Sequence, residues 1–239
     1  MKWKRIRLEE TDSTNIYINK VEQTNIIVSA EFQTAGRGQG TNKWESEYGK
    51  NLLFSLKVSP TWMLPRRQFL LSMIGALAVR DALAEYTDGI TAKWPNDIYW
   101  HDKKISGTLI QTTLSGSKIQ DFIFGVGINI NQRSFRSDAP NPVSLWQITG
   151  IDTDREEVLN KVLIYFEYYY TMLSEGNEDS LQQIYLKNLY RKDGFYYYED
   201  KEGIFEAEIV GINHSGHIIL RDRDGNIHEY EFKEVKFII

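Results

Sequence analysis

The chain has 239 residues, a length that suits one medium domain plus a small one or a single large α/β domain, and its 41% hydrophobic and 26% charged residues are typical of a globular protein. The formal net charge of −5 argues against a nucleic-acid-binding protein, although it leaves room for a local basic site. The absence of cysteine excludes disulfides, thiol catalysis and cysteine metal ligands, and the four histidines match no zinc-ligand pattern.

The N-terminal part of the chain predicts one short helix followed by two strands. The first residues, MKWKRIRLEE, lack the apolar stretch of a signal peptide, and no run is long enough to span a membrane, so we expect a cytoplasmic protein. Asp12 or Ser13 can cap a short helix that ends near Val21. A strand, a polar glycine-rich loop and a second strand follow over residues 25–32, 33–50 and 51–58.

The middle of the chain predicts a long helix and a hairpin. Apolar residues recur at helical spacing from Pro65 to Tyr86, and a proline near the start fits a helix N-terminus. Two short strands are expected near residues 90–93 and 98–100. The runs 104–114 and 118–130 then predict a hairpin that turns at Ser115–Gly116.

The last part of the chain predicts two helices and a separate small domain. After a loop over 131–142, Thr153 and Glu156 suggest a capping box for a helix to about residue 173, and a second helix covers roughly 179–190. Beyond residue 192 short strands alternate with turns, which indicates a small all-β barrel of about SH3 size. We therefore predict an α+β protein: a mixed β-sheet flanked by helices over 1–192, and the barrel over 193–239.

Two glycine- and hydroxyl-rich segments near the N-terminus are candidates for ligand binding. TDSTN (11–15) is either a plain helix cap or a site where exposed N–H groups and side chains bind a small polar group. GRGQGTNKW (36–44) places Arg37 between two glycines, which suits a phosphate clamp on a mobile loop, although an ordinary surface loop is the alternative. The segment matches neither the Walker A motif nor GxGxxG.

Three later segments also hold polar or glycine residues that packing alone would not require. KWPNDIYW (93–100) is either a proline turn or a site where Lys93 holds phosphate and Asp97 holds magnesium. In KISGTL (104–109), Lys104 is either a solvated strand end or a cation that stabilises developing negative charge. The alternating glycines of GVGININ (125–131) suggest close approach of a ligand or of another segment. The tyrosine-rich runs 165–170 and 195–200 are assigned to packing rather than base stacking.

In this order the segments resemble the biotin protein ligase family. The family pattern is an STN segment, a glutamine before a GRG loop that ends in tryptophan, then KWPND, KxxGxL and a GxGxN strand. The matching residues here are Ser13-Thr14-Asn15, Gln33, Gly36-Arg37-Gly38 through Trp44, Lys93 to Asp97, Lys104 with Gly107, and Gly125 to Asn129. The match spans residues 8 to 130, and the SH3-like tail extends it over almost the whole chain.

The resemblance implies a two-step ligase reaction. The carboxylate of biotin attacks the α-phosphate of MgATP to give biotinyl-5′-AMP and pyrophosphate, and a lysine of a biotin carboxyl carrier protein then takes the biotin. The resemblance implies Lys104 and Arg37 as catalytic residues, and Asp97 as a magnesium ligand. ATP would contact Arg37, Lys93, Asn96, Asp97 and Asn129. Biotin would contact Ser13, Thr14, Asn15, Gln33, Gly36, Arg37, Gly38, Trp44, Lys104, Gly107, Gly125 and Gly127, with the fused ring against the glycines and Trp44 as an apolar wall.

Two departures from the family pattern stand out. The usual loop is GRGRxGRxW, whereas Gln39 and Asn42 occupy positions where arginines are common, so Arg37 should carry more of the phosphate contact. The strand after KxxGxL often reaches a glutamate, and here Gln111 stands there without an assigned role. The rivals are a lipoate or octanoate protein ligase, whose arginine pair and triple glycine are missing from this sequence, and a biotin-binding regulatory protein without turnover.

The resemblance also bears on partners. Some family members carry an N-terminal DNA-binding domain, but the ligase pattern begins at about residue 8, so we expect a monofunctional ligase without specific nucleic-acid binding. Neither a monomer nor a homodimer is favoured. The tail barrel and the mouth of the site near Lys104 are the candidate docking surfaces for the carrier protein.

Overall fold

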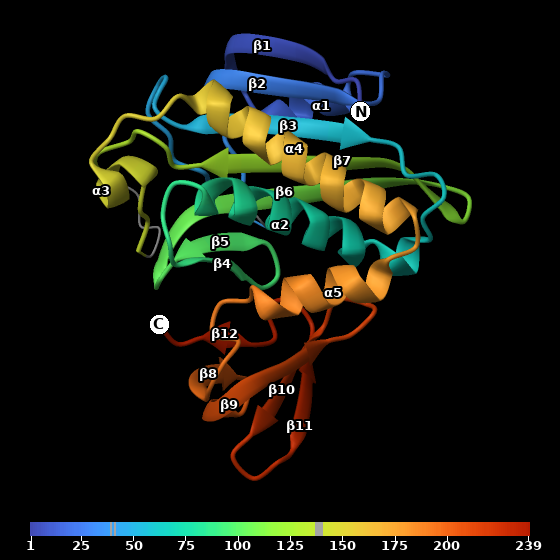
Figure 1. The fold of residues 1–239 in the computed structure, drawn as a ribbon, viewed down its shortest axis with the longest axis vertical. Helices are drawn as coiled ribbons and strands as arrows, with labels where there is room; N and C mark the ends of the chain where they lie inside the picture. Colours follow the sequence, from blue (N-terminus) through green and yellow to red (C-terminus); the bar gives the residue numbers. More distant parts are fainter. Residues whose placement is uncertain (39, 41, 137–140) are drawn as a thin grey trace.

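The computed structural model describes residues 1–38, 40, 42–136 and 141–239, so the question raised by Gln39 lies outside the described residues. A seven-stranded mixed sheet forms the larger part of the molecule, in the order β1-β2-β3-β7-β6-β5-β4 (Figure 1). Its strands are β1 (Lys4–Thr11), β2 (Ile26–Gln33), β3 (Leu52–Val58), β4 (Ile90–Lys93), β5 (Asp97–Trp100), β6 (Lys103–Ser115) and β7 (Lys118–Ile128). Only the β1–β2 pair of this sheet is parallel, which confirms the predicted mixed sheet.

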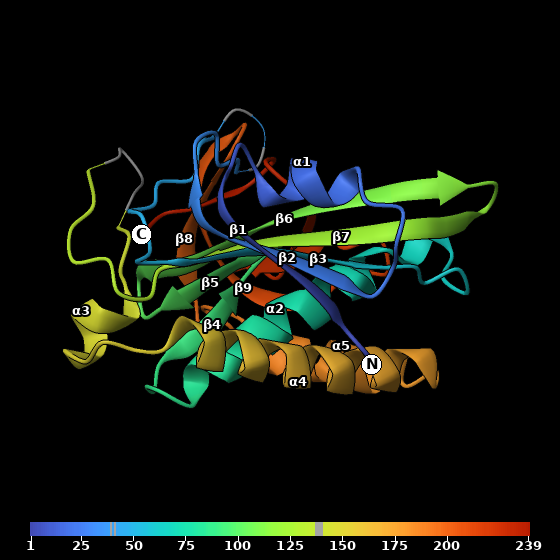
Figure 2. The ribbon, with the colours of Figure 1, turned by 90° about the horizontal axis from the view of Figure 1, so that it is seen from above.

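Helices cover both faces of this sheet unequally. The helices α2 (Phe69–Ala84), α4 (Arg155–Ser174) and α5 (Glu178–Lys187) lie on one face, and the short α1 (Thr14–Asn19) lies on the other (Figure 2). Helix α2 is buried on almost every side because the sheet and α4 enclose it, and a Cβ at Gly75 would overlap the ring of Phe124 on β7. Among the described residues, no helix is both long and apolar enough to cross a membrane.

The helix starts differ from the sequence expectations. The long helix begins as a 3-10 turn, η1 (Pro65–Arg67), before α2. The predicted capping box of Thr153 and Glu156 is wrong, since Asp154 is the N-cap of α4 and its carboxylate accepts a hydrogen bond from the Glu156 N–H at 2.9 Å. A complete capping box is found instead on α3 (Leu145–Thr149), where Ser144 and Gln147 bond reciprocally. Several hydrogen-bonding side chains compete for each helix start, and the fold decides which one reaches it.

A second, antiparallel sheet follows residue 192, in the order β11-β10-β9-β8-β12. Its strands are β8 (Tyr196–Asp200), β9 (Gly203–Ile212), β10 (Ile218–Asp222), β11 (Ile227–Tyr230) and β12 (Lys236–Phe237). This confirms the α+β class and is consistent with an SH3-like domain. The predicted barrel is not closed, however, because β12 has two residues and pairs with β8, so among the described pairings it does not reach β11. The boundary near residue 192 stays a prediction.

Candidate functional site

A cleft of about 360 Å³ lies where the loop 36–44, the turn 94–96, the glycine-bearing parts of β6 and β7 and the end of the chain meet. Its volume falls in the range of small-molecule sites, about 300–1,000 Å³. Most of the residues singled out by the sequence line it: Ser13, Thr14, Asn15, Gln33, Arg37, Gly38, Trp44, Lys93, Asn96, Asp97, Lys104, Gly107, Gly125 and Gly127. Gly36 and Asn129 are not among the lining residues.

The start of helix α1 forms one polar wall of the cleft. Ser13, Thr14 and Asn15 are all buried. The N–H and the hydroxyl of Thr14 both donate to Gln33 Oε1, at 2.8 and 3.1 Å, which joins the helix start to the end of β2. Ser13 is the N-cap by backbone geometry, but its side chain caps nothing. The hydroxyl of Ser13 therefore does not cap the helix, which is what a role in ligand binding requires.

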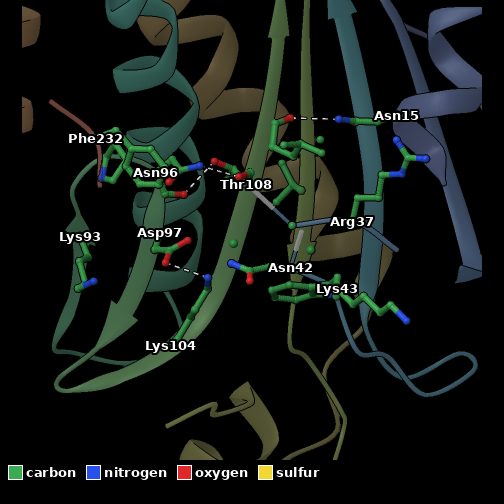
Figure 3. A pocket seen from close by; sticks show the side chains of 18 of the residues that line it. Asn15, Arg37, Asn42, Lys43, Lys93, Asn96, Asp97, Lys104, Thr108 and Phe232 are labelled. Carbon is green, nitrogen blue, oxygen red and sulfur yellow. Dashed lines mark hydrogen bonds and ion pairs between the residues drawn. The ribbon is translucent and has the colours of Figure 1, made fainter. Parts of the chain in front are cut away.

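Ser55 on β3 supports this wall and was missed by the sequence analysis. Its hydroxyl is fully buried and lies within hydrogen-bonding distance of Asn15 Oδ1 and of Thr14 Oγ1, the latter at 2.8 Å. The Asn15 amide in turn donates to the Leu109 carbonyl on β6 at 3.2 Å (Figure 3). A lone serine within the apolar run LLFSLKV is the signal that could have revealed it.

The strand glycines receive side chains of the protein itself. Gly107 on β6 lies opposite Gly127 on β7, and together they make a flat surface on which the Trp44 indole rests. A Cβ at Gly127 would overlap that indole, and one at Gly107 would lie 3.0 Å from its Cζ3. Gly125 similarly makes room for Asn15. The expected close approach at these glycines is thus made by Trp44 and Asn15, and the contact with biotin stays a prediction.

Lys104 and Asp97 form an ion pair in the cleft. Lys104 Nζ lies 2.8 Å from Asp97 Oδ2, and both side chains are partly shielded from solvent (Figure 3). The backbone of Lys104 is held by the chain after β7, since its N–H donates to the Asn141 carbonyl and its own carbonyl accepts from Val143, each at 2.9 Å. The carboxylate of Asp97 thus holds the ammonium, and the two backbone bonds hold the strand that carries it.

Asp97 is the one carboxylate among the described residues that line the cleft. No three His, Cys, Asp or Glu side chains of the described residues come together to hold a metal ion. Magnesium is commonly held by one or two carboxylates together with substrate phosphates. The donor set therefore fits an ion that arrives with a polyphosphate, and does not form a metal site of its own.

The turn between β4 and β5 is fixed onto β6. It contains the cis peptide bond Trp94–Pro95, and the amide of Asn96 donates to the Thr108 carbonyl at 2.6 Å while the Thr108 hydroxyl donates back to the Asn96 carbonyl at 2.8 Å. The side-chain amide of Asn96 is therefore already bonded to Thr108, and the predicted contact with ATP would have to share it.

Lys93 is the most enclosed cation of the site. Its Nζ lies 5.1 Å from the Tyr99 ring centroid and 4.8 Å from that of Phe237 on β12. Burial lowers the pKa of Lys93, and the carboxylate of Asp97 opposes this effect. Lys93 comes from β4 and Lys104 from β6, with β5 between the two strands, and the charge of Lys104 also lowers the pKa of Lys93.

The described ends of the glycine-rich loop pair with each other beside the cleft, through an antiparallel bridge between Arg37 and Lys43. Gly38 N–H donates to the Asn42 carbonyl at 2.8 Å, and Trp44 N–H donates to the Gly36 carbonyl at 3.0 Å. Arg37 is exposed, and no described residue forms an ion pair with its guanidinium. Figure 3 shows the guanidinium directed toward α1 and away from Lys104.

Further residues line the cleft that the sequence analysis did not select. Lys43 comes from the loop, and the end of the chain contributes Phe232, Lys233, Val235, Lys236 and Phe237. The second sheet is tied to the turn between β4 and β5 by a hydrogen bond of 2.8 Å from Trp94 Nε1 to the carbonyl of Gly216, which precedes β10. The charged lining is therefore almost wholly cationic, in a chain whose net charge is −5.

The comparisons with known proteins agree with this geometry. The model of the Biotin/lipoate A/B protein ligase family matches residues 4–129. The chain is 30% identical to the biotin–[acetyl-CoA-carboxylase] ligase of Paracoccus denitrificans over 91% of this chain and 94% of that protein. It is 29% identical to the bifunctional ligase/repressor BirA of Bacillus spizizenii over 83% of this chain, but spans only 62% of that protein.

A solved structure gives the same result for the fold. The biotin protein ligase of Aquifex aeolicus in complex with biotin and ATP superposes with a TM-score of 0.82 at 29% identity. The superposition covers 98% of this chain and 99% of the Aquifex chain. The likeness therefore extends over both sheets.

Proposed function

The chain belongs to the Biotin/lipoate A/B protein ligase family, and we propose that it activates biotin with ATP and transfers it to a lysine of a biotin carboxyl carrier protein. The observation that carries this proposal is the cleft. It combines a buried polar helix start, a positioned Lys104–Asp97 pair and a cationic lining. The likeness to ligases named for biotin favours biotin over lipoate.

The first step brings two anions together. A carboxylate oxygen of biotin attacks the α-phosphorus of ATP, the bond from that phosphorus to the β-phosphate oxygen breaks, and pyrophosphate leaves. Lys104 would neutralise the carboxylate and the charge that develops on the α-phosphate, with Asp97 holding its ammonium in place. Magnesium would enter as MgATP, with Asp97 as the available carboxylate.

The second step needs no nucleophile from the enzyme. The ε-amine of the acceptor lysine attacks the biotinyl carbonyl, the mixed anhydride breaks, and AMP leaves. The protein would keep the adenylate from water until the acceptor arrives, and the loop that carries Arg37, which lines the cleft, would do so.

Residues Ser13, Thr14, Asn15 and Gln33 would bind the polar ureido group of biotin, since they form the polar wall of the cleft. Asn129 would act from outside the cleft lining. Its amide donates to the Val143 carbonyl at 3.1 Å, while its buried Oδ1 has no hydrogen-bond partner among the described residues. The cytoplasmic location, the oligomeric state and the absence of nucleic-acid binding stay predictions.

Pyrophosphate exchange into ATP tests the proposal. It should be measured with magnesium and, in separate reactions, with biotin, octanoate or lipoate. Exchange with biotin alone supports the proposed function. Exchange with the fatty acids assigns the chain to the lipoate branch. No exchange, together with calorimetric binding of biotin, would instead indicate a binding protein without turnover.

A further inference from the structure

Strand β3 carries a buried lysine that the proposed reaction does not use. Lys57 is only 3% exposed, whereas lysine side chains are almost never fully buried without a partner. Its neighbours across the sheet are Ile26 on β2 and Ile123 on β7, which belong to a small apolar cluster with Ile18 of α1. Burial of an ammonium in such surroundings is costly unless a hydrogen-bonding group faces it.

The group that faces this ammonium belongs to the end of helix α1. Lys57 Nζ donates to the carbonyl of Val21, which lies just beyond the C-cap of the helix. The Val21 N–H donates in turn to the Ile18 carbonyl at 3.1 Å, so the accepting residue is joined to the last turn. Among the described residues no carboxylate forms an ion pair with Lys57. The lysine is therefore committed to the helix end.

The same face of β3 also holds the start of α1. Ser55 lies two residues before Lys57, so both side chains project from one face of the strand. The Ser55 hydroxyl lies within hydrogen-bonding distance of Thr14 and Asn15, the first two residues of the helix. Figure 2 shows α1 lying along this face of the sheet. Strand β3 thus holds α1 at both ends, with a hydroxyl at its start and an ammonium at its end.

Stability alone does not require a lysine at this position. Methionine has nearly the same length and would fill the apolar cluster without a charge to bury, and replacing buried ionic groups by apolar ones is often neutral or stabilising. What the lysine adds is a directional bond to one atom at the end of the helix. A helix of six residues depends on such contacts, because helices shorter than about 12 residues are marginal by themselves.

We propose that Lys57 is a positioning residue for biotin, which fixes the end of α1 through the Val21 carbonyl and so sets the place of Ser13, Thr14 and Asn15 in the cleft. This inference rests on the proposed function, in which those three residues bind the ureido group. The described residues that line the cleft do not include Lys57. Its effect on biotin must therefore pass through the helix.

Two variants separate the position of the helix from the stability of the protein. Lys57→Met removes the hydrogen-bond donor and keeps the length of the side chain. Ile123→Val trims the same apolar cluster but leaves the bond to the Val21 carbonyl, so it is the matched control for lost packing. The stability of each variant is measured by urea titration.

In biotin-dependent pyrophosphate exchange, Lys57→Met should raise the KM for biotin about tenfold, the effect of losing one charged hydrogen bond, and leave the KM for MgATP unchanged. Its urea midpoint should equal or exceed that of Ile123→Val, whose KM for biotin should match that of the parent protein. An unchanged KM for biotin in Lys57→Met, an equal rise in Ile123→Val, or an equal rise in the KM for MgATP overturns the inference. So does a lower urea midpoint than that of Ile123→Val, or a failure to fold, because the lysine would then serve stability.

Amide hydrogen exchange separates this inference from the proposed function, because it needs no ligand. The reporter is the Thr14 amide, which donates to Gln33 Oε1 at 2.8 Å. Exchange of this amide about tenfold faster in Lys57→Met than in the parent and in Ile123→Val supports the inference, even if the parent shows no pyrophosphate exchange and the proposed function fails. Exchange at the rate of the parent contradicts it.

Discussion

Lys104 is unusual among the lysines of the cleft because its ammonium is positioned by a carboxylate while the strand beneath it is fixed by backbone bonds. The pair also has a cost, since an anionic substrate must share the lysine with Asp97. A paired lysine in a partly shielded site is suited to stabilising charge that develops during a reaction, because little reorganisation is needed.

Replacement of Lys104 by alanine should therefore abolish most adenylation. We expect a fall of about 100-fold or more in the rate of biotin-dependent pyrophosphate exchange. The matched control is Lys103→Ala, which removes the exposed neighbouring lysine at the start of β6. Near-normal exchange by Lys104→Ala, with an unchanged circular dichroism spectrum, would remove this residue from the mechanism.

Arg37 presents a different case, since it is exposed and has no ion pair with a described residue. Its proposed task begins only when an adenylate is bound. We expect Arg37→Ala to release biotinyl-5′-AMP about tenfold faster, because one charged contact with the phosphate is lost. Release is measured by chromatography of the filtrate after a single turnover without acceptor. Retention equal to that of the parent protein would show that the clamp lies elsewhere.

At the scale of elements, strands β6 and β7 decide the shape of the site. Their glycines at 107, 125 and 127 allow Trp44 and Asn15 to lie directly on the backbone. The alternation of glycine in the sequence predicted a close approach at this strand. It could not predict that side chains of the same chain make the approach, because those side chains come from segments about 60 to 110 residues away and only folding brings them there.

Gly127→Ala tests this arrangement. The added methyl overlaps the Trp44 indole, so the tryptophan must move and we expect biotin binding to weaken by about tenfold or more. Binding is followed by calorimetry, and tryptophan fluorescence reports the displaced ring. The control is Gly211→Ala on β9, where a Cβ would meet only Ile219 Cδ1 at an ordinary 3.6 Å. Equal biotin affinity in both variants would contradict the assignment.

Other elements show the limit of local patterns. Strand β1 was not predicted because most of its residues are charged, yet it pairs along β2 and its Arg5 and Arg7 contact Glu156 of α4. Such an edge strand is defined by its neighbour rather than by its own β-propensity. Helix α2, in contrast, was predicted from apolar residues at helical spacing and from Pro65 near its start, and its run of 16 mostly apolar residues is too long for an ordinary strand.

At the scale of the whole molecule, tyrosines are concentrated in the interior and at the junction of the two sheets. Burial raises the pKa of Tyr99, Tyr185 and Tyr198. Burial together with a hydrogen bond to Asp102 raises the pKa of Tyr190 to about 12. Each of these phenols is harder to ionise in the folded state than in the unfolded chain, where the pKa is about 10.

The free energy of unfolding should therefore depend on pH in the alkaline range. A group with a raised pKa contributes stability that is fully present below its unfolded value and is lost as the pH rises through its folded value. We expect the free energy of unfolding to fall from about pH 10 to about pH 12, as measured by urea titrations. Tyr190→Phe should make this decline shallower. A flat profile across the range would show that these phenols titrate normally.

The sequence by itself determined the order of the chemical groups along the chain. The STN segment, the GRG loop, KWPND, KISG and GVGIN were all recognisable, because glycine, proline and hydroxyl residues placed against the local pattern carry a signal within a few residues. It also determined the α+β class, since helical and strand periodicities are local properties.

Only the tertiary structure decided which of these groups share one cleft and what completes it. The support of Asn15 by Ser55 and the enclosure of Lys93 by Phe237 join residues that are distant in the chain or were silent in its pattern. Lys104 and Asp97 were both recognised, but their ion pair depends on how β6 lies against β5. Lys233 is the clearest example. In the sequence it is one lysine among many, and its place beside Gly40 follows from the packing of the second sheet against the turn between β4 and β5, where Trp94 donates a hydrogen bond to the Gly216 carbonyl.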